Sequence, residues 1–159
     1  MRIDFGAAKS LQAILQKDLA AIGKLEAEIV SLQKANLSEA EAVQLAYALH
    51  NVYGALENSF EQVTRTFENH IVNRERWHHE LLEKMFLDLG TLRPAVLPNE
   101  VKPVLRDLLG FRHLFRHAYD YSLDTAKVIA LSQQWLRSSD KIRVALQAFA
   151  DQLGQIASE

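Results

Sequence analysis

Residues 39–68 read EAEAVQLAYALHNVYGALENSFEQVTRTFE, a long run in which Gly54 is the only glycine. Ser38 and Glu41 form an S-x-x-E capping box, which predicts that a helix begins at this point. The apolar side chains of the run cover a broad surface rather than a narrow stripe: Val43, Leu45, Ala46, Leu49, Val52, Leu56, Phe60, Val63 and Phe67. We therefore predict a central helix from Glu39 to about Glu68 that contacts several neighbouring helices.

An amphipathic helix is predicted before this segment, over residues 9–33. Its apolar residues fall at a/d spacing, with Asp18 interrupting the stripe: Leu11, Leu15, Ile22, Leu25, Ile29 and Leu32. The pattern extends over only about three heptads, which favours a bundle helix over a true coiled coil.

Three more helices are predicted after the central segment. A short helix from Trp77 to Leu89 should end at Gly90, and another should run from about Asn99 to Arg116. Asp124 is a candidate N-cap for a fifth helix, which could be interrupted at Ser138–Asp140. Alternating β patterns and internal repeats are absent from the sequence. We therefore expect an all-α bundle of four to five helices that forms a single domain over residues 1–159.

The composition restricts the class of protein further. The chain has 159 residues, 48% of them apolar and 24% charged, with a formal net charge of −2 and no cysteine. The lack of cysteine excludes disulfides and thiolate metal sites and fits a reducing compartment. The N-terminus lacks the apolar region of a signal peptide, and no apolar run is long enough to span a membrane. We expect a cytoplasmic protein that does not contact a membrane.

Metal and cofactor motifs are incomplete in this sequence. Glu75 and His78 form one E-x-x-H motif, but a di-iron site needs a second such motif and two further glutamates. His79 to Glu83 resembles H-E-x-x-H but has glutamate where the second zinc ligand should be. Phosphate-binding loops and nucleophile elbows are also missing. We therefore expect no metal and no cofactor.

The most polar stretch is GFRHLFRHAYDYSLD, residues 110–124. From Lys102 to Arg116 the basic residues outnumber the acidic ones: Lys102, Arg106, Arg112 and Arg116 against Asp107. Arg112 and His117 form an R-x4-H pair, in which arginine can bind phosphate oxygens and histidine can transfer protons near neutral pH. On one straight helix these two side chains would point about 140° apart. They could converge only if the helix ends between them or if a second chain contributes.

Two less specific interpretations remain open at this point. Cationic side chains at a helix C-terminus complement the helix dipole without any further function. His50, Tyr53 and Glu57 lie at i, i+3 and i+7 of the central helix, and a polar edge with ordinary packing is the favoured interpretation of this row.

A larger motif surrounds the R-x4-H pair. Arg112, His117 and Tyr119 occupy the three positions of R-x4-H-x-Y, with His113 directly after the arginine. This motif resembles that of HepT-like toxins of the HEPN superfamily of helical ribonucleases. The segments YGALENSFEQVTRTFE (53–68) and WHHELLEKM (77–85) are also similar to one HepT-like branch, so the resemblance covers about residues 40–125.

The resemblance implies a homodimer whose two R-x4-H motifs meet in one cleft that cleaves RNA without metal. By this resemblance Arg112 holds phosphate, His117 transfers protons, and His113 and Arg116 are auxiliary RNA-binding residues. It also implies a partner antitoxin, a nucleotidyltransferase of the MNT type, which in some systems transfers AMP to the motif tyrosine, here Tyr119. A bulky anionic adduct there would block the cleft and repel RNA phosphates.

Some positions and alternatives are left undecided by the resemblance. Glu57 and Asn58 could face the cleft, although a surface or packing role is favoured for both. Roles for His78 and His79 are not assigned. The alternative function is a non-catalytic helical module that binds a nucleotide or a nucleotidyltransferase through the same basic cleft. A purely structural bundle would leave the polar cluster unexplained.

Overall fold

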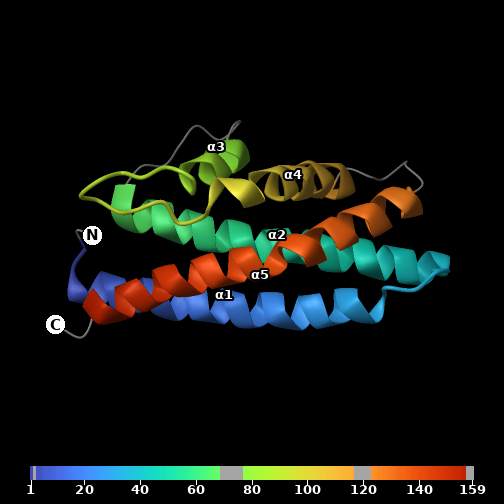
Figure 1. The fold of residues 1–159 in the computed structure, drawn as a ribbon, viewed down its shortest axis with the longest axis horizontal. Coiled ribbons are helices and arrows are strands. Elements are labelled where there is room, and N and C mark those ends of the chain that lie inside the picture. The colour runs from blue at the N-terminus through green and yellow to red at the C-terminus, as the bar shows by residue number, and fades with distance from the viewer. Residues whose placement is uncertain (2, 69–76, 117–122, 157–159) are drawn as a thin grey trace.

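The computed structural model describes residues 1, 3–68, 77–116 and 123–156. These residues form five α-helices and one 3-10 turn, in the order α1 (Phe5–Ser31), α2 (Glu39–Glu68), α3 (Trp77–Lys84), η1 (Asn99–Val101), α4 (Lys102–Arg116) and α5 (Thr125–Ile156). No strand occurs among them, so the predicted all-α bundle is confirmed. The helices α1, α2 and α5 run the length of the molecule, and α3 and α4 lie along α2 on the side away from α1 (Figure 1).

The central position predicted for α2 is confirmed, because this helix contacts α1, α3, α4 and α5. Its capping box forms as expected: the Ser38 backbone N–H donates to Glu41 Oε2 at 3.0 Å, and the Glu41 N–H donates to Ser38 Oγ at 3.2 Å. Hydrogen bonds from Lys34 and from the Ser38 backbone lower the pKa of Glu41 to about 2. The start of α2 is therefore fixed by local chemistry that the sequence already displays.

Asp18, which interrupts the apolar stripe of α1, is buried against α2. Its carboxylate accepts hydrogen bonds from Asn58 Nδ2 and Ser59 Oγ, each at 2.8 Å. A buried carboxylate is tolerated where such donors replace the water that it loses. Asn58 therefore joins α2 to α1.

The helix α3 is shorter than the sequence predicts, because it ends at Lys84 and not at Leu89. The Met85 backbone carbonyl accepts from the N–H groups of Val96 and Leu97, at 2.9 and 3.0 Å, instead of continuing the helix. Gly90 has a φ of 59°, a left-handed conformation that glycine adopts at little cost. Contacts with the loop that follows thus end the helix early.

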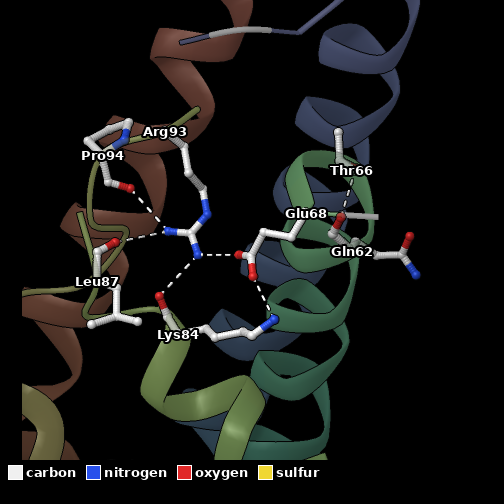
Figure 2. A network of polar contacts seen from close by, with 7 residues as sticks. All are labelled: Gln62, Thr66, Glu68, Lys84, Leu87, Arg93 and Pro94. Atoms are coloured by element: carbon white, nitrogen blue, oxygen red, sulfur yellow. Dashed lines mark hydrogen bonds and ion pairs between the residues drawn. The ribbon is translucent and has the colours of Figure 1, made fainter. Parts of the chain in front are cut away.

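Arg93, in that loop, is fully buried and organises the end of α3. Figure 2 shows its guanidinium between the Glu68 carboxylate and three backbone carbonyls. The nitrogens donate to Glu68 Oε1 at 2.6 Å, to the Lys84 carbonyl at 3.0 Å, and to the Leu87 and Pro94 carbonyls at 3.2 Å. Burial raises the pKa of Glu68, but hydrogen bonds from Lys84 and Arg93 outweigh it and leave that pKa below its ordinary value.

The last helix, α5, confirms one prediction and contradicts another. Asp124 is its N-cap, because Asp124 Oδ1 accepts from the Lys127 backbone N–H at 3.3 Å. The possible interruption at Ser138–Asp140 is wrong, since α5 is continuous from Thr125 to Ile156. Ser139 is buried within the helix, and its hydroxyl donates to the Leu136 carbonyl at 3.5 Å. A serine that bonds its own helix in this way does not break it.

In the described part of the chain, no helix combines the length and the apolar character that crossing a membrane requires.

Candidate functional site

The C-terminal half of α4 lies antiparallel against the middle of α2 (Figure 1). Phe115 packs on His50, with ring centroids 5.4 Å apart, while Arg112 reaches Glu57 further along α2. This packing brings the arginine of the R-x4-H motif onto the polar row formed by His50, Tyr53 and Glu57. The row thus contacts the motif, a feature that the spacing within α2 alone does not reveal.

Glu57 links three helices through one carboxylate. Arg112 Nη2 lies 3.2 Å from Glu57 Oε1, and His78 Nδ1 of α3 lies 2.7 Å from Glu57 Oε2. The side chains of Arg112 and Glu57 are only 16% and 10% exposed, whereas that of His78 is 40% exposed. The ion pair is therefore largely shielded from water, which strengthens it and fixes the direction of the guanidinium.

The polar row holds further buried atoms beside this ion pair. His50 Nδ1, Tyr53 Oη and Arg112 Nε are buried and have no hydrogen-bond partner within the described ranges. Burial lowers the pKa of His50, and the positive charges of Arg112 and Arg116 lower it further, so the ring is neutral at pH 7. Burial also raises the pKa of the Tyr53 hydroxyl. The site thus combines a shielded cation with neutral hydrogen-bonding groups.

The basic residues of α4 have different partners along its length. Lys102 and Arg106 both pair with Glu83 of α3, at 2.5 and 2.8 Å, and these contacts outweigh burial to lower the pKa of Glu83. Near the other end Arg116 is exposed and has no ion-pair partner among the described residues. Among the described residues, the basic side chain of α4 that has no carboxylate partner therefore lies at the C-terminal end of this helix, at Arg116.

The predicted site residues are only partly within the described ranges. Arg112, His113 and Arg116 lie in the last two turns of α4, with His113 and Arg116 exposed. His117 and Tyr119 lie outside the described residues, so their geometry relative to Arg112 stays a prediction. The same holds for Glu75 of the E-x-x-H motif.

Two residues of the site, Glu57 and His78, were not assigned a functional role from the sequence. Glu57 is the partner of Arg112, and His78 is the second partner of Glu57. The sequence feature that pointed to Glu57 was the i, i+3, i+7 row of His50, Tyr53 and Glu57 on α2, in which Glu57 is the carboxylate.

Across the described ranges, no three histidine or acidic side chains come together as metal ligands.

The fold and this site define the class of protein: a helical bundle with a shielded arginine near the end of α4, in a sequence that contains R-x4-H-x-Y. The family of HepT-like proteins matches residues 44–153, which is more than half of the chain and includes Arg112 and Glu57. The chain therefore belongs to the HepT-like family. Comparison with curated proteins and with solved structures gave no significant match.

Proposed function

We propose that this protein is a metal-independent endoribonuclease and the toxin of a toxin–antitoxin pair. The observation that carries the proposal is the shielded Arg112–Glu57 pair, which holds a guanidinium near the end of α4, five positions before His117. Membership of the HepT-like family supports the same interpretation. We assign the catalytic roles to Arg112 and His117, with His113 and Arg116 as auxiliary contacts to RNA.

The proposed reaction uses the RNA's own 2′-hydroxyl as nucleophile. That oxygen attacks the adjacent phosphorus, the bond from phosphorus to the 5′-oxygen breaks, and the products are a 2′,3′-cyclic phosphate and a 5′-hydroxyl. One proton leaves the 2′-hydroxyl and one reaches the departing 5′-oxygen, and His117 is the residue assigned to this transfer. Such positioned proton transfer contributes about 10²–10⁴-fold to a rate. Arg112 stabilises the charge that develops on the phosphorane oxygens.

The site is proposed to be completed by a second copy of the chain. Arg112 and His117 would point about 140° apart on one straight helix, and a cleft between two protomers removes this difficulty. We assign residues 1–159 to one domain, because α1 shares a single hydrophobic core with the other helices. The proposed partner is a cognate nucleotidyltransferase antitoxin of the MNT type, and Tyr119 is the proposed acceptor of AMP. We place both proteins in the cytoplasm.

The test is incubation of the purified protein with total cellular RNA in EDTA, after mass spectrometry has verified that Tyr119 carries no adduct. Discrete cleavage that leaves 2′,3′-cyclic phosphates is expected. Arg112→Ala and His117→Ala should each abolish it while the protein remains a folded dimer. Arg137→Ala, at an exposed position on α5, is the matched control and should cleave normally.

Absence of cleavage by the unmodified wild-type protein would contradict the proposal. In that case Arg112→Ala should instead weaken binding to the nucleotidyltransferase, as expected for a non-catalytic binding module.

A further inference from the structure

Beside the Arg112–Glu57 pair, four rings form a continuous aromatic row across α2 and α4. Tyr47 and His50 of α2 are stacked, with centroids 6.5 Å apart and planes inclined by 18°. His50 contacts Phe115 of α4 at 5.4 Å, and Phe115 is stacked on Phe111 at 5.7 Å. The row thus leads from a surface helix face to the arginine-bearing end of α4.

The outer end of this row is open to solvent. Tyr47 is 58% exposed, whereas His50, Phe111 and Phe115, which follow it in the row, are half-buried. Phe111 and Phe115 also pack on the hydrophobic core, which holds the inner rings in place. The protein therefore presents an exposed phenol ring on a rigid aromatic support.

Two arginine side chains of α4 lie near the row. Both Arg112 and Arg116 act on His50, since their charges lower the pKa of that ring. The nearby carboxylate that opposes them, Glu57, is already paired with Arg112 and hydrogen-bonded to His78. The Arg116 guanidinium, at the adjacent end of α4, has no carboxylate partner among the described residues. It is thus available to a planar ligand that stacks on Tyr47.

We propose that Tyr47, His50 and Phe115 form a base-stacking surface that binds an unpaired nucleotide of single-stranded RNA, with its phosphate directed to Arg116. This inference rests on the proposed function and names the substrate class of the same site. Aromatic rings next to arginines bind single-stranded nucleic acid because every base offers a flat face to stack on and every nucleotide brings a phosphate. The surface is therefore expected to select unpaired over duplex RNA with little preference for one base.

The test uses the cleavage-deficient His117→Ala protein and a single-stranded oligoribonucleotide that contains 2-aminopurine, whose fluorescence is quenched on stacking. Tyr47→Ala in this background should weaken binding by about 5- to 140-fold and abolish the quenching. Tyr47→Phe keeps the ring and should bind within about twofold of the parent. Leu114→Ala removes an apolar side chain that is 71% exposed on α4 without removing a ring, so it is the matched control and should bind normally.

The possible failures are distinguishable. Unchanged RNA affinity and quenching in Tyr47→Ala, with cleavage intact in the wild type, would overturn the stacking surface and leave the proposed nuclease standing. Conversion of Tyr47→Ala to a monomer in light scattering would identify the surface as a contact between two copies and would also overturn it. If the wild type neither binds nor cleaves RNA, the proposed function fails and the stacking surface fails with it.

Discussion

Replacing Glu57 by glutamine tests whether this carboxylate positions Arg112. The change keeps the size of the side chain but removes the charge that attracts Arg112 Nη2 at 3.2 Å and His78 Nδ1 at 2.7 Å. Exposed ion pairs contribute about 0.2–1 kcal/mol, and loss of one partner from a fully buried pair costs about 3–5 kcal/mol. With side chains 16% and 10% exposed, the Arg112–Glu57 pair lies between these limits. We expect the free energy of unfolding to fall by about 2 kcal/mol.

For a chain of this size that loss corresponds to a Tm lower by about 4–8 °C, measured by circular dichroism at pH 7. Glu61→Gln is the matched control, because Glu61 lies one turn further along α2 and pairs with the exposed Arg65. It should lower Tm by no more than about 1–2 °C. In the RNA cleavage assay Glu57→Gln should reduce kcat by up to about 10²-fold, since a misdirected guanidinium no longer meets the developing charge. Equal Tm values for the two variants, or normal kcat in Glu57→Gln, would refute the positioning role.

Two further predictions concern His50 and Arg93. Burial and the charges of Arg112 and Arg116, opposed in part by Glu57, favour the neutral form of His50, so NMR titration should give a pKa below 6.5, and Arg112→Ala should raise it. The stabilising contribution of neutral His50 is complete above pH 6.5 and is lost as the pH falls through the lowered pKa; His50→Gln should therefore flatten the pH dependence of stability in that window. Arg93→Met removes the donor of Glu68 Oε1 and of the Lys84, Leu87 and Pro94 carbonyls, and leaves Lys84 as the remaining partner of Glu68. This loss should cost about 3–5 kcal/mol in urea unfolding. Arg106→Met, which breaks an exposed pair, should cost less than about 1 kcal/mol, and equal losses for the two variants would contradict the structure.

Features of the fold that depend on neighbours in sequence were predictable. The capping box of Ser38 and Glu41 placed the start of α2, and Asp124 placed the start of α5. The early end of α3 was not predictable, because it depends on Arg93 and on Val96 and Leu97, which return from the following loop. The periodic apolar pattern of the sequence continues past the end of α3. It does not indicate that N–H groups from the following loop will bond the last carbonyl groups of the helix.

The same distinction applies to the candidate site. Arg112 was recognised from a local motif, whereas its partner Glu57 lies on α2 and is separated from it in the sequence by α3 and the loop of residues 85–98. Only the antiparallel packing of α4 on α2 selects Glu57 rather than Asn58, which turns to Asp18 on α1. Two neighbouring residues of α2 thus contact different helices. Which of them pairs with Arg112 can be known only once the position of α4 is known.

The distribution of charge on α4 explains how an acidic chain with a net charge of −2 could use RNA as a substrate. Of its four lysines and arginines, Lys102 and Arg106 share the single negative charge of Glu83, and Arg112 pairs with Glu57. Little unpaired positive charge is then left on α4 to contact phosphates, and affinity from phosphate contacts on this helix alone would be low and strongly reduced by salt. Stacking on Tyr47 is much less sensitive to salt, so it would supply the affinity that the charges do not. On the proposed function, the carboxylates paired along α4 would also direct phosphate binding to the C-terminal end of this helix, and the aromatic row lies at that same end.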